Sequence, residues 1–177
     1  SLLTDETEWL INPSGAWTLG GPQADSGLTG RKLAVDFYGS DCPIGGGALS
    51  GKDGTKTDRT GAYAMRYIAK NLIAQEAMNG ADCCQTQVSY AIGKKEPCSF
   101  RIKFNDNSFD RMNEKKIRNL EQKVLSSIDL RPRALVERFG LDKPIFYPTA
   151  RNGHFGVKPY SVGNLNFYTW EQLDLSL

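Results

Sequence analysis

Histidine is almost absent from this chain of 177 residues, because His154 is the only one. No nucleophile or carboxylate motif accompanies it, so we expect a structural role for His154. Cysteine is also sparse. The adjacent Cys83 and Cys84 lack metal-ligand spacing, and no second pair of Cys or His answers them. We therefore predict that all four cysteines are free thiols in a reducing cytoplasm and that Cys98 lies in a buried strand.

The chain has neither a dominant charge nor a long apolar run. Lys and Arg number 22 against 20 Asp and Glu, which leaves a net charge of +2. No global basic field for nucleic acid is present, and a basic site must be local. No apolar run approaches the roughly 20 residues that span a bilayer, and residues 1–10 lack the features of a signal peptide. We expect a cytoplasmic protein that binds neither nucleic acid nor membrane.

Apolar periodicity predicts an α+β fold in the last two thirds of the chain. The first expected element is a helix from about Asp58, with Asp58 or Thr60 as its cap and Gly80 as a stop signal. An antiparallel pair of strands follows, at Gln85–Ile92 and residues 100–104. Two more helices are expected, over residues 113–128 and from Pro132 to Phe139, the second ended by Gly140. Helix, two strands and helix indicate small β-sheets with helices packed on one face.

The first third is organised differently. Short strands are expected at residues 8–11 and 17–19, around an Asn-Pro-Ser-Gly turn, and at residues 33–37. Long loops separate these strands and their apolar periodicity is weak. This third would form a poor core alone, which suggests that it packs against something outside this chain.

Glycine gathers in one block, residues 20–58, which holds ten of the 18 glycines. Glycine lets the backbone approach a ligand closely, and Lys and Arg bind anions. The block also carries four cations and several carboxylates. It therefore predicts a loop region for a phosphate-rich small molecule; the cations are Arg31, Lys32, Lys52 and Lys56.

Several motifs in this order resemble S-adenosylmethionine synthetase (methionine adenosyltransferase). They are GGPQADSGLTGRK, GGGALSGKDGTKTDR, QVSYAIG, DLRP, KPI and GHFG. The match is only to the C-terminal half of the family. The GHPDK-type and GDQG-type motifs of the N-terminal half, with the family's histidine and a magnesium-binding Asp, do not occur here. The chain thus resembles half of an active site, covering about half of the three-domain family subunit.

The resemblance implies transfer of the adenosyl group of ATP to the sulfur of methionine, followed by hydrolysis of tripolyphosphate to pyrophosphate and phosphate. It also implies Mg²⁺ and K⁺, with most metal ligands coming from a partner chain, and sites between subunits. The expected organisation is residues 1–22 as strands completing a domain of the partner, 23–59 as the ATP- and triphosphate-binding part of a second domain, and 60–177 as the C-terminal α+β domain.

Site residues are implied position by position. Arg31 and Lys32 match the Arg-Lys after LTG that binds triphosphate. Lys52 matches the Lys of SGKD, where Ser50 is also assigned to ATP binding. Lys56 is implied near phosphate and the methionine carboxylate. The other implied roles are metal and phosphate for Asp58, methionine and ribose for Asp25, adenine stacking for Trp17, and the site entrance for Ile92.

Some positions depart from the family pattern, which puts fine loop geometry in doubt. Ala24 stands where Gly is usual, Ile44 replaces a common His, and Leu49 replaces a common Phe. The main hypothesis is one subunit of a split, two-chain synthetase, a hetero-oligomer that uses ATP and L-methionine. The alternatives are a non-catalytic ATP-binding regulatory subunit and a fragment of a full-length enzyme. Without the resemblance, Arg31 and Lys32 would be read as a solvated pair more readily than as a ligand site. Lys52, Lys56 and Asp58 would be read as a helix-entry cap with surface charges as readily as a ligand site.

Overall fold

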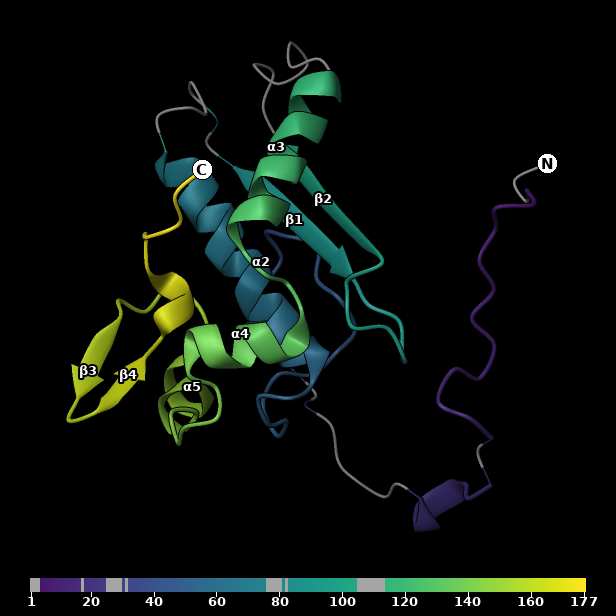
Figure 1. The fold of residues 1–177 in the computed structure, drawn as a ribbon. Helices are drawn as coiled ribbons and strands as arrows, with labels where there is room; N and C mark the ends of the chain where they lie inside the picture. Colours follow the sequence, from purple (N-terminus) through teal and green to yellow (C-terminus); the bar gives the residue numbers. More distant parts are fainter. Residues whose placement is uncertain are drawn as a thin grey trace.

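The computed structural model describes residues 4–16, 18–24, 30, 32–75, 81, 83–104 and 114–177. Figure 1 shows a folded body, formed by the described residues from 30 onward, and an N-terminal arm, residues 4–24, that extends away from it. The arm contacts the body near residues 93 and 94, where Lys94 forms an ion pair with Glu8 and Gly93 lies against Pro13. Several of the arm's large apolar side chains are exposed, namely Trp9, Leu10, Ile11 and Leu19.

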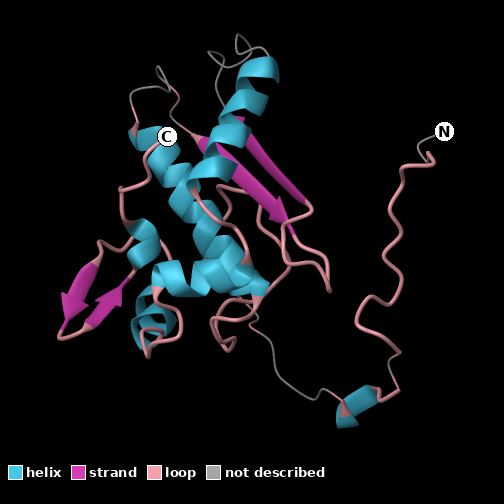
Figure 2. Ribbon diagram, viewed as in Figure 1, coloured by secondary structure: helices cyan, strands magenta, loops and turns pink. Residues whose placement is uncertain are grey.

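Helix α2 (Thr57–Ala74) is the central element of the body (Figure 2). The helix is confirmed, but the apolar stripe that its period predicted as the core face is wrong: of Ala62, Met65, Ala69, Leu72 and Ile73, only Leu72 is buried. The buried face is Tyr63, Ala64, Tyr67, Ile68 and Leu72, at most 1% exposed, because the C-terminal tail covers the tyrosine side of the helix through Trp170. The predicted cap is wrong. Lys56 is the N-cap residue and no side chain caps the helix. Asp58 pairs with a lysine instead, and the Thr60 hydroxyl donates to the Lys56 carbonyl. The predicted stop at Gly80 lies outside the described residues.

The predicted antiparallel pair is present as β1 (Cys84–Ser89) and β2 (Ser99–Phe104). The register places Val88 opposite Phe100 and Thr86 opposite Ile102. Phe100, Ile102 and Phe104 are buried while the residues between them are exposed, which is the two-residue period expected of a half-buried strand. Helix α2 packs against β1, and the Thr86 hydroxyl donates to the Met65 carbonyl.

Two further predicted helices are confirmed. Helix α3 is Glu114–Ser127 and helix α4 is Pro132–Phe139. Pro132 occupies the first turn of α4, and Gly140 ends it in the left-handed region with φ of 65°. Beyond α4 lie elements that periodicity did not predict: α5 (Tyr147–Asn152), the antiparallel strands β3 (Tyr160–Val162) and β4 (Leu165–Phe167), and the 3-10 turn η4 (Thr169–Glu171).

The last residues of the chain close the core over α2. Trp170 is fully buried and stacks on Tyr63, with ring centroids 3.7 Å apart. The Asn71 side-chain oxygen accepts from the Leu175 amide, and Gln75 donates to the Leu175 carbonyl. The C-terminal tail is therefore as much a part of the core as the hairpin. The α+β class with small sheets and packed helices is confirmed.

The strand predicted at residues 33–37 was wrong for this chain. The segment forms a single helical turn, α1 (Leu33–Asp36), and the Phe37 and Gly39 amides bond locally to the carbonyls of Leu33 and Ala34. In the described part of residues 4–24 the only regular element is the 3-10 turn η1 (Gly21–Gln23). Strands here depend on a neighbouring strand for their hydrogen bonds, so the assignment of residues 1–22 to a partner's domain stays a prediction.

None of the four cysteines, all of which lie within the described residues, forms a disulfide bond, as predicted. Cys98 is a correction, because it is exposed just before β2 rather than buried within a strand. None of the helices in the described ranges is long and apolar enough to cross a membrane.

Candidate active site

The glycine-rich loop, residues 45–54, leads directly into the N-terminal end of α2. Its backbone lies very close to the rest of the body. A Cβ on Gly47 would stand 2.0 Å from Asp58 Oδ1, and one on Gly54 would stand 2.5 Å from the Leu141 carbonyl oxygen. Any side chain at either position must displace these neighbours. Glycine here therefore allows the loop to press against Asp58 on one side and the segment after α4 on the other.

Two Lys–Asp pairs cluster at this end of α2. Lys52 Nζ lies 2.7 Å from Asp58 Oδ2, and Lys56 Nζ lies 2.7 Å from Asp53 Oδ2. The hydrogen bond from Lys56, with two more from Thr55, holds the pKa of Asp53 well below its usual range. The side chains of Lys52 and Lys56 are 27% and 52% exposed. Both ammonium groups can therefore reach a ligand from solvent.

Arg59 fixes the loop from inside the body. Its side chain is buried, and its Nε donates to the Leu49 carbonyl at 3.0 Å. The guanidinium lies 3.9 Å from the centroid of the Phe146 ring, a cation–π contact. Burial lowers the pKa of Arg59. Its Nη1 has no hydrogen-bond partner among the described residues.

His154 links the loop to α2 and the tail. Ser50 Oγ lies 2.9 Å from its Nε2, and the Tyr63 hydroxyl lies 2.8 Å from its Nδ1. Its backbone carbonyl accepts from the indole of Trp170 at 2.8 Å. The ring is 1% exposed, and burial together with the charge of Arg59 lowers the pKa of His154 to about 4. The imidazole is therefore neutral near pH 7.

A cavity of about 790 Å³ opens beside the loop, between α2 and β1. Residues 42–47 form one wall, and the face of α2 that carries Ala62, Met65, Ala69 and Ile73 forms another. Asp58 lies at the end of the cavity nearest the loop, while Arg66 and Lys70 line it two and three turns further along α2. Asp58 therefore both lines the cavity and pairs with Lys52 of the loop. The apolar lining includes Ala62, Met65, Ala69, Ile73 and Val88.

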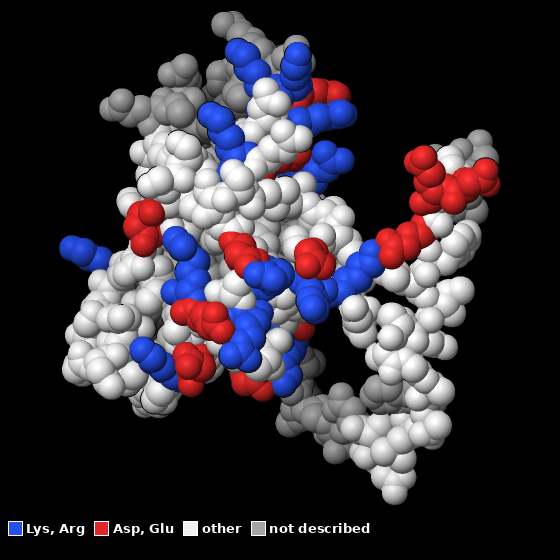
Figure 3. Space-filling view, viewed as in Figure 1, with Lys and Arg blue, Asp and Glu red and all other residues white. Residues whose placement is uncertain are grey.

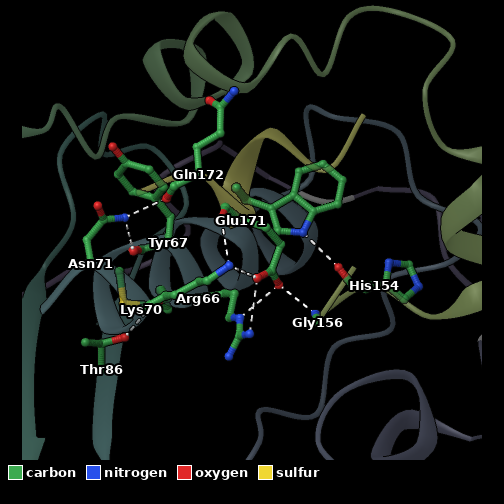
Figure 4. Close-up of polar contacts among 11 residues, drawn as sticks. Arg66, Tyr67, Lys70, Asn71, Thr86, His154, Gly156, Glu171 and Gln172 are labelled. Atoms are coloured by element: carbon green, nitrogen blue, oxygen red, sulfur yellow. Dashed lines mark hydrogen bonds and ion pairs between the residues drawn. The ribbon is translucent and has the colours of Figure 1, made fainter. Parts of the chain in front are cut away.

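Glu171 neutralises the two cations that line this cavity (Figure 4). Its side chain is fully buried and accepts from Arg66 Nε at 2.9 Å and from Lys70 Nζ at 2.8 Å. The Gly156 amide donates to it at 2.8 Å. Burial alone would raise the pKa of Glu171, but these hydrogen bonds outweigh it and hold the pKa below its usual value. The tail thus sets the charge balance along α2.

The structure brings together some of the predicted site residues and not others. Lys52, Lys56, Asp58 and Ser50 share the loop and the first turn of α2. Lys32 is exposed just before α1. Two residues earlier, Gly30 lies beside the loop, because a Cβ added at Gly30 would stand 3.5 Å from the Cβ of Ala48. Ile92 is 75% exposed in the β1–β2 connection and does not line the cavity. Trp17, Asp25 and Arg31 lie outside the described residues.

Several residues of this region escaped sequence reasoning. Arg59 and Tyr63 lie in a segment for which the sequence predicts only a helix, and the sequence gives Glu171 no role. Each of them is a polar or amphipathic residue buried at no more than 2% exposure. Their partners stand about 10, 91 and 105 residues away in the chain. No local pattern carries that information, although a lone histidine within GHFG was a signal for His154.

Charge on the visible face of the body is mixed in sign, with blue and red side chains interspersed rather than separated (Figure 3). Among the residues that the structure describes, no three His, Cys, Asp or Glu gather as a metal site. Asp58 is the one predicted ligand, and its Oδ1 faces Gly47 while Oδ2 holds Lys52. Mg²⁺ commonly uses one or two carboxylates together with substrate phosphates, so Asp58 fits as a single contributor.

Residues 19–172 match the family model described as "S-adenosylmethionine synthetase, C-terminal domain". A solved structure, an unusual S-adenosylmethionine synthetase from Campylobacter jejuni, is 39% identical with a TM-score of 0.66. The match covers 93% of this chain and 40% of that one.

Curated relatives give the same result. The chain is 46% identical over 170 residues to an S-adenosylmethionine synthase of Pelagibacter ubique, covering 96% of this chain and 41% of that protein. It is 45% identical to one of Ruegeria sp., covering 98% and 42%. The chain therefore belongs to the S-adenosylmethionine synthetase family. It spans about two fifths of the length of these relatives and corresponds to their C-terminal part, as predicted.

Proposed function

We propose that this chain is the C-terminal-half subunit of a two-chain S-adenosylmethionine synthetase, which forms S-adenosylmethionine from ATP and methionine and releases pyrophosphate and phosphate. The observation that carries the proposal is the pair of solvent-reachable lysines at the glycine-rich loop, Lys52 and Lys56, each held by an aspartate at 2.7 Å. The names of the relatives supply the product, S-adenosylmethionine, and the substrates and released phosphates are those that the family resemblance implies.

The chemistry asks for cations at this place. The methionine sulfur attacks the ribose C5′, the C5′–O bond breaks, and the triphosphate leaves with its bonding electrons. Charge grows on the leaving group, and preorganised cations stabilise it. One ammonium ~4 Å from a phosphate oxygen gives about 4 kcal/mol at an effective dielectric of ~20, before desolvation. In the proposal Lys52, Lys56, Arg31 and Lys32 supply these cations.

The ion pairs support this role. Until a ligand arrives, Asp58 and Asp53 neutralise the two lysines at the loop. A polyphosphate competes with these carboxylates for the ammonium groups, and Asp58 is then free to bind a cation. We assign Asp58 to Mg²⁺, which would neutralise phosphate charge. The remaining metal ligands, and any K⁺ site, are assigned to the partner half.

The nucleoside and methionine end of the site rests on the resemblance. Trp17 offers a large π face for adenine, Asp25 is assigned to methionine and ribose, and Ile92 to the site entrance. The cavity beside α2 and the exposed apolar side chains of the arm fit a chain that packs against the N-terminal half. A reducing cytoplasm, where ATP and methionine meet, is compatible with four free thiols.

The direct experiment mixes this chain with a polypeptide carrying the family's N-terminal half and measures S-adenosylmethionine formation. Activity should need both chains. Full turnover by this chain alone would sink the two-chain proposal.

A lysine variant separates catalysis from regulation. In the assembled complex, Lys52→Ala should lower turnover by 10²-fold or more, a loss typical of a transition-state contact. Lys123→Ala, which removes an exposed lysine of α3, is the matched control and should leave turnover unchanged. Unchanged turnover in Lys52→Ala would favour the alternative, a non-catalytic ATP-binding regulatory subunit.

A further inference from the structure

Two hydroxyl groups flank the imidazole of His154, one from the glycine-rich loop and one from the interior of the body. Ser50 Oγ stands 2.9 Å from Nε2 and the Tyr63 oxygen stands 2.8 Å from Nδ1. Ser50 is half-buried, whereas His154 and Tyr63 are at most 1% exposed. The three side chains form an unbroken row from the core to the edge of the loop that carries Lys52.

A neutral imidazole has one N–H donor and one bare nitrogen acceptor. It must therefore donate to one hydroxyl and accept from the other, and only two arrangements exist. In the first, Tyr63 donates to Nδ1 and Nε2–H donates to Ser50. In the second, Nδ1–H donates to Tyr63 and the Ser50 hydroxyl donates to Nε2.

The buried end of the row favours the first arrangement. A phenol is a much stronger hydrogen-bond acid than an aliphatic hydroxyl, and the burial that raises the pKa of Tyr63 keeps its proton in place. That proton lies in the core, where a donor without an acceptor is costly. The Tyr63 hydroxyl contacts Nδ1 at 2.8 Å and also the side chain of Thr149. A bare imidazole nitrogen is a stronger acceptor than a hydroxyl oxygen, so the phenol proton goes to Nδ1. Ser50 stands at the partly open end, where its own proton can find another partner.

The two arrangements differ in what Ser50 offers a ligand. If Nε2–H donates to Oγ, the Ser50 proton stays available to donate outward. If Ser50 spends its proton on Nε2, only lone pairs face outward, and these repel an anion. We propose that Tyr63 and His154 are positioning residues that order the Ser50 proton, so that Ser50 donates to a phosphate oxygen of the polyphosphate held by Lys52.

The inference rests on the proposed function for its ligand. The placement of the protons, however, rests only on the hydrogen-bonded row of Ser50, His154 and Tyr63. Since His154 is the only histidine, labelling the chain with ¹⁵N-histidine gives the signals of one imidazole. Long-range ¹H–¹⁵N correlation spectra at pH 7.5 should show Nε2 protonated and Nδ1 bare. A ring protonated at Nδ1 would overturn the proposal whatever the behaviour of any variant.

Binding of inorganic tripolyphosphate, measured by calorimetry, tests the consequence. Ser50→Ala should weaken binding about tenfold, the loss expected for one hydrogen bond to a charged group. Tyr63→Phe leaves Nδ1 without its donor, lets the ring take the other tautomer, and should weaken binding by about twofold or more, but by no more than Ser50→Ala does. The double variant should bind no worse than Ser50→Ala alone, because both changes remove the same contact.

Tyr67→Phe is the matched control. It removes a buried phenol from the same helix, one that contacts Asp174 rather than His154. It should alter neither the tautomer nor the affinity. Equal affinity of Tyr63→Phe and wild type, or additive losses in the double variant, would overturn the role of Tyr63 and His154 while leaving the polyphosphate site standing. Failure of the wild-type chain to bind tripolyphosphate would overturn both that site and the role of Ser50 in it.

Discussion

Lowering the pH from 7 to 5 should destabilise this chain through one side chain, His154. The buried ring holds its pKa at about 4, against 6.5 for an ordinary histidine. The unfolded state therefore takes up a proton in a range where the folded state does not. Stability from the neutral ring is fully present above pH 6.5 and is lost progressively as the pH falls towards 4.

The size of the effect follows from the two pKa values. At pH 5 the unfolded histidine is almost fully protonated while the folded one is mostly neutral, which costs about 2 kcal/mol relative to pH 7. The pH window isolates the histidine. Carboxylates titrate mainly below this range and thiols above it, and the chain has no other imidazole.

Urea unfolding at 25 °C under reducing conditions measures this difference in the free energy of unfolding. The His154→Gln variant is the control. Its stability at pH 7 should be lower because buried contacts are lost, yet it should change by less than about 0.5 kcal/mol between pH 7 and 5. If wild type and variant lost equal stability on acidification, the ring would not be held neutral by burial and the hydrogen-bond row would lose its basis.

Other predictions concern the tail and the loop. Replacing Glu171 by Gln leaves two part-buried cations without their carboxylate and should cost about 3 kcal/mol in urea unfolding, whereas Glu137→Gln, which breaks an exposed pair, should cost less than about 1 kcal/mol. Gly47→Ala should weaken tripolyphosphate binding, because the new methyl group cannot fit against Asp58 and pushes the loop that carries Ser50 and Lys52 away from the start of α2. Gly45→Ala, with open space around its Cβ position, should bind as wild type; equal effects of the two glycine variants would contradict the tight approach at Gly47.

The regular elements with a strong period were predictable from sequence. The alternation of Phe100, Ile102 and Phe104 buries one face of β2, as the two-residue period predicts. Helix α2 was also predictable, but its buried face was not, because the C-terminal tail covers the Tyr63 side of the helix instead of the predicted apolar stripe. The prediction that Asp58 caps α2 was wrong because the Asp58 carboxylate forms an ion pair with Lys52 instead. The sequence pattern of a cap does not show whether a carboxylate will accept from a backbone N–H of the helix or pair with a nearby lysine.

The segment at residues 33–37 failed for a different reason. A strand is stable only when a neighbour supplies its hydrogen bonds, and here the backbone bonds within α1 instead. The site residues were likewise predictable only in part. The motifs placed Lys52, Lys56 and Ser50 on one loop, but only folding brought His154 and Tyr63 to that loop, from up to 104 residues away.

The closure of the core by the tail has a consequence for synthesis of the chain. Trp170 stacks on Tyr63 and Leu175 bonds to Asn71, so the buried face of α2 has no complete cover until residues 170–175 have been made. Helix α2, the hairpin and α4 are all synthesised well before those residues. The body, and with it the glycine-rich loop that His154 contacts, therefore cannot be completed until about 100 residues after α2 have followed it out of the ribosome.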